Sequence, residues 1–440
     1  MSHFGLTSLR QLDHQPAPPA YNPSMSADLP SYEQAAAIVA AHANTFAQHR
    51  PRIERIPLAS ATGRILAAPM VADDDQPPFP RSTRDGYACR AVEASAHLAL
   101  PVAGAAHAGQ APAGPLPPSA AWEIMTGAPV PAGADCVVML EHVERSGSAI
   151  RLVPARTIQL GDNVVAQGAQ SRRGDQLLQP GTPLAPAQIA LAASLGYAQL
   201  DVYVRPRVAI LTTGDELVPI NVAPGPGKIR NSNAPMLAAL IAQAGGDPII
   251  LATAADTAEA LDAALSQAAE ADMLLISGGV SAGKFDLVEP ALARRGATFH
   301  FTGVRIQPGK PLVFGEIPAS GEPPAAQPFF GLPGNPISSA ATFHLFAAPI
   351  LAALAGSRET HPRFVLAQLS RNTDRKTSPL TRFLPARCTF SPSVNAQPQL
   401  ALVPWQGSGD LTAFAQSNCF LVIPEDANLE AGTPVRILLH

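Results

Sequence analysis

The chain has 440 residues, of which 47% are hydrophobic and 15% are charged, and its formal net charge at pH 7 is -4. This length and hydrophobic content are sufficient for about two to four domains with cores of their own. Because the counts of charged residues give no basic excess, we expect no nucleic-acid binding and no binding to anionic membranes.

The start of the chain and its cysteines indicate a cytoplasmic protein. Residues 1–27 are rich in Pro, Ser and Gln and are interpreted as a flexible leader, because they lack the charged and apolar regions of a signal peptide. The longest apolar stretch, 344–355, is interrupted by Pro349 and predicts no membrane segment. Four widely separated cysteines are interpreted as small buried residues without metal or disulfide spacing: Cys89, Cys136, Cys388 and Cys419.

The first half of the chain predicts one helix, a β-rich module and a second helix. The segment 31–48 begins with an N-cap serine and continues with strong helix formers. The stretch 73–80 has too many prolines for regular structure and marks a domain boundary. Short β-prone runs broken by Gly and Pro fill 85–163. A helix over 186–195 and a strand over 200–204 follow, and we expect this pair to pack on the first helix.

The central region alternates strands and helices. The predicted strands are 208–211, 248–251 and 273–276, and the predicted helices are 234–244, 258–269 and 287–295. Alternation of this kind predicts a parallel sheet. Further strands at 299–304, 312–314 and 328–330 precede a long buried helix over 337–355. Beyond Arg358, short strands punctuated by Pro, Asn and Gly predict a small β-barrel or sandwich.

The sequence therefore predicts a multidomain α/β protein with a central parallel sheet. Its predicted segments are a flexible leader (1–27), a linker domain (28–72 with 164–203), a β-rich module (73–163), an α/β domain (204–356) and a C-terminal β domain (357–440).

Three Gly-rich loops each follow an apolar, β-branched run directly, at 213–217, 277–281 and 331–336. In a parallel α/β sheet, ligands bind at the carboxyl ends of the strands, so the three loops predict one shared pocket. Glycine lets the backbone approach a ligand, and the following helix offers unpaired N–H groups to an anion.

Each loop also has a purely structural interpretation. Asp215 and Glu216 follow a strand end, where two carboxylates can bind Mg²⁺ or one of them can cap a helix. The glycines and hydroxyls of 277–286 suit phosphate oxygens, but a tight strand-to-helix turn also needs glycine. In 331–336, two prolines leave the amides of Gly334 and Asn335 exposed in a rigid turn, which favours a small oxyanion over a plain connection.

Other turns carry charged and hydroxyl groups. Arg305 and Lys310 flank a Pro-Gly turn and can meet the charge of phosphate or another oxyanion, although a surface hairpin is the alternative. In the β-rich module, Asp85 and Thr126 lie on turns, and neither motif is convincing alone.

Taken together, these motifs resemble the molybdopterin molybdotransferase (molybdenum insertase) family, which includes the E domain of gephyrin. The resemblance covers roughly residues 30 to 440. It rests on Pro77-Pro78-Phe79, Asp85-Gly86-Tyr87-Ala88, Met125-Thr126-Gly127-Ala128-Pro129-Val130-Pro131, Thr213-Gly214-Asp215-Glu216-Leu217, Ser277-Gly278-Gly279-Val280-Ser281, Pro308-Gly309-Lys310-Pro311 and Leu332-Pro333-Gly334-Asn335-Pro336.

The resemblance implies a four-domain, L-shaped homodimer with a molybdopterin-binding type of α/β domain and an active site shared between subunits. It implies that adenylylated molybdopterin and molybdate are substrates, that Mg²⁺ is the cofactor, and that AMP and molybdenum cofactor are products. Molybdopterin adenylyltransferase and molybdoenzyme-maturation proteins would be its partners.

The resemblance also assigns residue roles. The catalytic residues would be Asp85, Thr126, Glu216, Asp286 and Lys310, and the metal ligands Asp215, Glu216 and Asp286. The substrate-binding residues would be Gly214, Asp215, Asp256, Ser277, Gly278, Gly279, Ser281, Arg305, Pro333, Gly334, Asn335, Pro336, Arg382 and Ser408.

Three departures from the family pattern support an alternative function. The family usually has Asn-Val-Arg followed by Gly-Glu-Asp, where this chain has 163–165 (Asn-Val-Val) and 168–170 (Gly-Ala-Gln). Lys284 stands where an acid is common, and Gln307 stands where Lys or Arg usually precedes Pro-Gly. The alternative is a catalytically altered paralogue that binds or delivers molybdopterin or molybdenum cofactor. A generic nucleotide-binding α/β enzyme accounts for the central domain alone.

Overall fold

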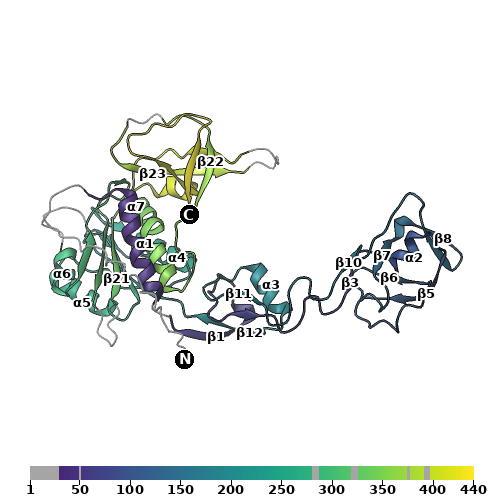
Figure 1. The fold of residues 1–440 in the computed structure, drawn as a ribbon. Helices are drawn as coiled ribbons and strands as arrows, with labels where there is room; N and C mark the ends of the chain where they lie inside the picture. Colours follow the sequence, from purple (N-terminus) through teal and green to yellow (C-terminus); the bar gives the residue numbers. More distant parts are fainter. Residues whose placement is uncertain (1–28, 49–50, 280–286, 319–325, 374–376, 391–396) are drawn as a thin grey trace, which may run out of the picture. The chain divides into compact units, whose positions relative to one another are not determined.

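The computed structural model describes residues 29–48, 51–279, 287–318, 326–373, 377–390 and 397–440 (Figure 1). Contacts divide the chain into two compact units, Met1–Glu54 with Tyr203–His440, and Arg55–Val202. The boundaries of the five predicted segments stay a prediction.

A six-stranded mixed sheet forms the centre of the first unit. Its strands, in spatial order, are β16 (Asp247–Ile250), β13 (Arg207–Thr212), β17 (Met273–Ser277), β21 (Gln327–Leu332), β20 (Val313–Ile317) and β18 (Thr298–Phe301). The first four are mutually parallel, as predicted, but β20 is antiparallel to both of its neighbours. The predicted parallel sheet is therefore confirmed for these four strands, and the antiparallel pairing of β20 with both of its neighbours makes the whole sheet mixed.

Helices cover both faces of this sheet (Figure 1). One face packs against α1 (Tyr32–Gln48), α4 (Asn233–Gln243), α7 (Pro336–Thr342) and α8 (Ala348–Leu354). The other packs against α5 (Ala258–Ala268) and α6 (Val288–Arg294). Neighbouring residues of β13 alternate between the two cores, with Ile210 in the first and Ala209 and Leu211 in the second. Burial on both faces explains why the predicted strands are continuous apolar runs.

Helix α1 confirms its predicted start. The Ser31 hydroxyl accepts from the Gln34 amide at 3.2 Å, and the Gln34 side chain accepts from the Ser31 amide at 2.9 Å, which is a capping box. The helix buries one stripe of side chains in the core shared with α8, namely Tyr32, Ala35, Val39, Ala43 and Phe46. The expected packing of α3 (Pro186–Ser194) and β12 (Gln199–Tyr203) on this helix is wrong, because both pack in a separate core around Leu66 and Met70.

The predicted long helix is also confirmed. Pro336 occupies its first turn, and α7 continues through a π-helical turn, Phe343–Ala347, into α8. Among the described residues this is the one helix, Pro336–Leu354, that is long and apolar enough to cross a membrane. Of its most apolar 18-residue window, 78% is buried inside the protein, which is the environment of a core helix.

A small barrel completes the first unit. Its strands are β22 (Phe364–Leu369), β23 (Thr381–Thr389), β24 (Gln399–Leu402), β25 (Cys419–Ile423) and β26 (Pro434–Leu439). The order β23-β24-β22-β26-β25 closes through pairing of β25 with β23, so the predicted barrel or sandwich is a barrel. The short strand β19 (Ile306–Gln307) pairs with β23 in parallel. The helix α9 (Leu411–Gln416) is capped at its start by the Asp410 carboxylate.

The second unit contains the predicted β-rich module, a six-stranded sheet of order β7-β4-β6-β5-β9-β8. These strands are β4 (Gly86–Cys89), β5 (Leu100–Ala106), β6 (Ala121–Ile124), β7 (Cys136–Met139), β8 (Val143–Ser146) and β9 (Ala149–Leu152). The helix α2 (Ala91–Ser95) lies beside it, and short pairs outside it involve β2 (Met70–Val71), β3 (Arg81–Ser82), β10 (Val164–Val165) and β11 (Gln176–Leu178).

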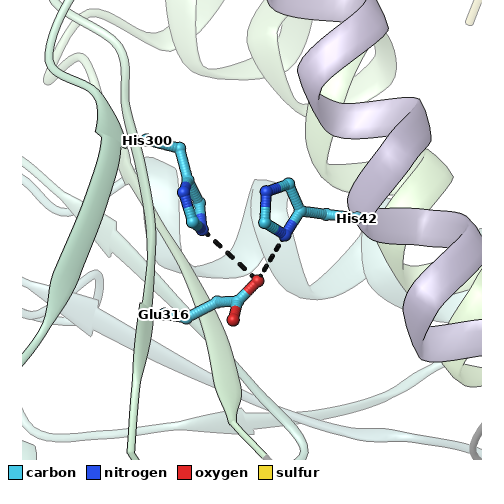
Figure 2. A group of neighbouring side chains, drawn as sticks. All are labelled: His42, His300 and Glu316. Atoms are coloured by element: carbon cyan, nitrogen blue, oxygen red, sulfur yellow. Dashed lines mark ion pairs between the residues drawn. The ribbon is translucent and has the colours of Figure 1, made fainter. Parts of the chain in front are cut away.

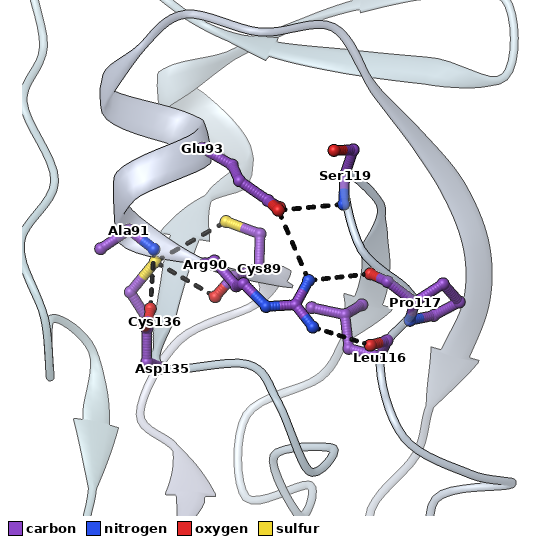
Figure 3. Close-up of polar contacts among 9 residues, drawn as sticks. All are labelled: Cys89, Arg90, Ala91, Glu93, Leu116, Pro117, Ser119, Asp135 and Cys136. Carbon is purple, nitrogen blue, oxygen red and sulfur yellow. Dashed lines mark hydrogen bonds and ion pairs between the residues drawn. The ribbon is translucent and has the colours of Figure 1, made fainter.

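All four cysteines are buried and free, as predicted. Cys89 and Cys136 are direct partners on β4 and β7, with their sulfurs 3.6 Å apart, a contact that their spacing in sequence did not indicate. Beside them, the Arg90 guanidinium donates to the carbonyls of Leu116 and Pro117 at 3.0 and 2.9 Å (Figure 3). These bonds hold the loop that precedes β6 against the sheet.

Candidate active site

The three Gly-rich loops lie together at one edge of the central sheet. Strands β13, β17 and β21 are adjacent and parallel, so their carboxyl ends meet. The Thr213 amide donates to the Ser277 carbonyl at 3.1 Å, and the Gly278 amide donates to the Leu332 carbonyl at 3.3 Å. The sequence-based expectation that these loops share one location is therefore confirmed.

A cavity of about 300 Å³ opens between these loops. It is lined by Thr213, Gly214, Glu216, Asp256, Gly278, Gly279, Pro311, Pro333, Gly334 and Asn335. Gly278 has a φ of +95°, and a Cβ at this position would lie 2.5 Å from the Thr213 carbonyl oxygen. Only glycine fits here, because a side chain would be strained and would collide with the neighbouring loop.

The carboxylates at this edge belong to two loops that bind each other. The Asp215 amide lies 3.4 Å from Oδ2 of Asp256, and the Asp256 amide lies 3.3 Å from Oδ1 of Asp215. Lys228 Nζ donates to the Asp215 carbonyl at 2.6 Å. Glu216 and Asp256 are exposed and line the cavity. The paired loops thus present two carboxylates to one cavity.

Asn233 is a site residue that the sequence reasoning missed. It is the first residue of α4, and its Nδ2 donates to the Ser277 hydroxyl at 2.8 Å and to the Gly334 carbonyl at 2.7 Å. It therefore ties the second loop to the third. The Asn-Ser-Asn sequence at 231–233 was the available signal, since such residues favour helix starts.

A larger cavity of about 740 Å³ adjoins the first and shares Pro311, Pro333 and Asn335 with it. Its other lining residues are Ile306, Gln307, Pro308, Gly309, Lys310, Ser338, Ser378, Leu380, Trp405, Gln406, Gly407 and Ser408. Lys310 is exposed on this wall. The Ser408 carbonyl accepts from the Ile337 amide at 3.0 Å, which holds the barrel loop against the start of α7. No sequence motif pointed to four of these lining residues, namely Ser338, Ser378, Trp405 and Gln406.

Several predicted site residues lie elsewhere in the described structure. Arg305 lines neither cavity, and its Nε lies 3.5 Å from Oε1 of Glu425. Arg382 is buried in the barrel, where Nη2 donates to the Ala427 carbonyl at 3.1 Å. Ser277 and Pro336 are not among the residues that line the two cavities; they lie at the end of β17 and in the first turn of α7. Ser281 and Asp286, with Lys284, fall outside the described residues.

Asp85 and Thr126 form a pair in the second unit. Oδ1 of Asp85 accepts from the Thr126 amide at 2.6 Å and from the Thr126 hydroxyl at 2.9 Å. The backbone N–H, and then the hydroxyl, hold the pKa of Asp85 below its usual value. The carboxylate is therefore ionised and fixed in direction at neutral pH, although it is exposed.

The fold and the cavities define a multidomain α/β protein with two adjoining cavities at one edge of its central sheet. Three family models match in chain order: the MoeA N-terminal region (domain I and II) over residues 30–196, the probable molybdopterin binding domain over 209–353, and the MoeA C-terminal region (domain IV) over 367–440. The chain belongs to the MoeA family.

Relatives extend along most of the chain. A molybdopterin molybdenumtransferase of Haemophilus influenzae is 32% identical over 87% of this chain and 93% of its own length. A molybdopterin molybdenumtransferase of Nostoc is 39% identical over 71% of this chain and 72% of its own length. The crystal structure of the molybdopterin biosynthesis MoeA protein of Pyrococcus horikoshii OT3 has a TM-score of 0.73 at 28% identity, covering 94% of this chain and all of that chain.

Proposed function

We propose that this protein is a molybdopterin molybdenumtransferase, an enzyme that inserts molybdenum into a molybdopterin substrate. The observation that carries the proposal is the pair of adjoining cavities, about 740 and 300 Å³, which share the Pro333 and Asn335 wall. Such volumes suit a small-molecule substrate. The names of the relatives, with the family membership of the whole chain, support the same reaction class.

The finer proposal is that the substrate is adenylylated molybdopterin. Its charges would be met by three features of the larger cavity. Lys310 supplies a cation, Ser408 and Ser338 supply hydroxyl donors, and the start of the long helix at Pro336 supplies the positive end of its dipole. In the smaller cavity, the bare backbone at Gly278 and Gly334 lets phosphate oxygens approach closely.

Mg²⁺ fits the donors of the smaller cavity. Glu216 and Asp256 offer exposed carboxylate oxygens on the same wall, and oxygen is the ligand type that Mg²⁺ prefers. Asp215 is held beside them by its contact with the Asp256 amide. When bound there, Mg²⁺ would neutralise phosphate charge. Asp286, the third predicted ligand, lies outside the described residues.

The residues of this chain would act by binding and positioning. Molybdate is a substrate, and Lys310 with the α7 start would hold its oxyanion near the molybdopterin end of the substrate. Attack of water on the adenylate phosphorus breaks the phosphoanhydride bond: the water oxygen becomes part of AMP, and the bridging oxygen stays on the molybdopterin phosphate, which is the leaving group. If a molybdate oxygen attacks instead, that oxygen joins the adenylate to molybdenum, and a dithiolene sulfur of molybdopterin then displaces AMP from molybdenum, so that an Mo–S bond forms as the Mo–O bond breaks. A site built from rigid loops suits such a reaction, because positioning accounts for much of its catalysis.

One assay separates this proposal from the alternative of a binding or delivery paralogue. Purified protein is incubated with adenylylated molybdopterin, Mg²⁺ and saturating molybdate, and AMP is measured by chromatography, with a molybdate-free sample as control. Molybdate-dependent AMP release supports the transferase. Tight binding of molybdopterin without AMP release would select the paralogue, which the uncharged Gln307 in the larger cavity motivates.

We also propose a homodimer in which Asp85 and Thr126 of one subunit serve the site of its partner. Mixing two inactive variants, Asp85→Asn and Glu216→Gln, would then restore part of the activity in mixed dimers. A single monomeric species in solution, or no recovery on mixing, contradicts the shared site. The cytoplasmic location and the pathway partners stay predictions.

A further inference from the structure

Two histidines converge on one carboxylate of the first unit, away from the lining of both cavities. His42 lies on α1, His300 on β18 and Glu316 on β20 (Figure 2). Nδ1 of His42 lies 2.6 Å from Oε1 of Glu316, and Nε2 of His300 lies 3.3 Å from the same oxygen. The three potential ligand atoms all lie within 4.8 Å of one another.

A β-bulge directs His300 toward this cluster. In the pairing of β18 with β20, Phe299 pairs with Gly315 and Phe301 pairs with Phe314, so His300 is the extra residue between them. Phe299 packs in the core under α5 and α6, whereas Phe301 packs in the core under α1. The bulge thus places His300 on the α1 side, where its ring lies 3.9 Å from the ring of His42.

The cluster is enclosed but accessible to a small ion. The side chains of His42, His300 and Glu316 are 14%, 12% and 21% exposed, and the Phe314 ring lies 5.4 Å from the His42 ring and 5.0 Å from the His300 ring. A carboxylate oxygen and two imidazole nitrogens gathered in one enclosed place are groups that bind metal ions.

One imidazole nitrogen lacks a hydrogen bond in this arrangement. Nε2 of His300 is buried and, within the described residues, makes no hydrogen bond despite its proximity to Glu316. A buried imidazole nitrogen without a hydrogen bond is costly, and an ion bound between the three side chains would coordinate it in place of the ion-pair contact with Glu316.

We propose that His42, His300 and Glu316 form a site for a divalent transition metal such as Zn²⁺. Two imidazoles and one carboxylate are a common ligand set for Zn²⁺, with water completing the coordination. Imidazole ligands favour Zn²⁺, Co²⁺ or Ni²⁺ over Mg²⁺, so this site differs in ligand chemistry from the carboxylates of Glu216 and Asp256. The ion would fasten α1 to β18, the edge strand of the sheet.

To test the proposal, Zn²⁺ is titrated into the full chain. Excess Mg²⁺ is present throughout, so that carboxylates that bind Mg²⁺ are already occupied. Isothermal titration calorimetry is expected to show one high-affinity Zn²⁺ per chain, and Zn²⁺ should raise the melting temperature. His42→Gln, His300→Gln and Glu316→Gln should each weaken binding at least tenfold and abolish the thermal shift. His361→Gln, at an exposed position of the same unit, should bind as the wild type does.

A second measurement locates the ion. Anomalous diffraction at the zinc edge from crystals of the wild-type protein should place Zn²⁺ between the three side chains. If the cluster is only an ion-pair network, the wild type will bind no Zn²⁺, or all three variants will bind it unchanged, or the anomalous signal will lie elsewhere. Each of these results overturns the proposal, and circular dichroism of the variants checks that a loss of binding is not a loss of fold.

Discussion

Asn233 donates a hydrogen bond of 2.7 Å from Nδ2 to the carbonyl oxygen of Gly334. The same amide group donates to the Ser277 hydroxyl, so one side chain joins the ends of β17 and β21 to the start of α4. Its Oδ1 is buried and finds no hydrogen-bond partner within the described residues. This leaves an acceptor at the edge of the proposed substrate site.

Asn233→Asp should weaken both the fold and the site. A carboxylate cannot donate, and its charge would face the Gly334 carbonyl oxygen, so we expect a loss of about 1–3 kcal/mol of unfolding free energy. The KM for the molybdopterin substrate should also rise, because the third loop loses its anchor. Urea denaturation and steady-state kinetics measure the two effects. Asn221→Asp, at an exposed position, is the matched control and should change neither.

Gly278→Ala should be costly because of where the new methyl group falls. The residue has a φ of +95°, and a Cβ would lie 2.5 Å from a backbone oxygen of Thr213. We expect a loss of about 1–3 kcal/mol in urea denaturation. Gly225→Ala provides the control, because a Cβ there meets no described atom within 4 Å. Equal stability of the two variants would contradict the described loop geometry.

Thr126→Val should raise the pKa of Asp85 without restoring its usual value. The variant removes the hydroxyl donor but keeps the backbone N–H, which is the larger cause of the lowered pKa. Carboxyl NMR titration measures this shift directly. Thr126→Ser keeps both donors and should leave the pKa as in the wild type. A Val variant that titrates like the wild type would show that the hydroxyl makes no contribution.

Stability should fall as the pH decreases from about 6.5 to about 4. Burial, and then the neighbouring His440, lower the pKa of His344 to about 4. Between these pH values the unfolded chain, whose histidines have a pKa near 6.5, binds more protons than the folded chain. The contribution of neutral His344 to stability is therefore complete above about pH 6.5 and is lost as the pH falls toward 4. At about 1.4 kcal/mol for each pKa unit, His344 accounts for a loss of roughly 3 kcal/mol.

His344→Leu is expected to flatten this part of the pH profile, although burial also lowers the pKa of His440 to about 4 and keeps part of the slope. Denaturant unfolding at a series of pH values measures the difference. The lowered pKa of Glu316 acts in a separate window, below about pH 4.3. An unchanged slope between pH 6.5 and 4 in the variant would show that His344 is not the cause.

Local sequence signals predicted the strands that are buried on both faces and the helix ends that a capping residue marks. Strands β13 and β17 are buried on both faces and so read as continuous apolar runs, which placed them to within one or two residues. The start of α1 followed from Ser31 and the end of α4 from Gly245, which has a φ of +88°. The antiparallel direction of β20 did not follow, because pairing direction depends on how the chain returns to the sheet.

The candidate site was predictable only where a motif carried it. Gly278, Glu216 and Pro333 stood in loops after strands, and their convergence follows from the parallel order of those strands. Trp405 and Gln406 come from a barrel loop with no recognisable pattern, and their place beside Lys310 depends on tertiary packing. The His42, His300 and Glu316 cluster was equally invisible, because three distant elements and a β-bulge bring it together.

The proposed transferase activity is tested most directly by AMP release from adenylylated molybdopterin, with Mg²⁺ and saturating molybdate, in the wild type and in Glu216→Ala. Glu216 is exposed on the wall of the smaller cavity, so its removal should leave the fold intact. We expect molybdate-dependent AMP release by the wild type, a decrease of about 100-fold or more in the variant, and no change in the control Glu430→Gln. No AMP release by the wild type, or unchanged release by Glu216→Ala, would contradict the proposed function or the proposed site, respectively.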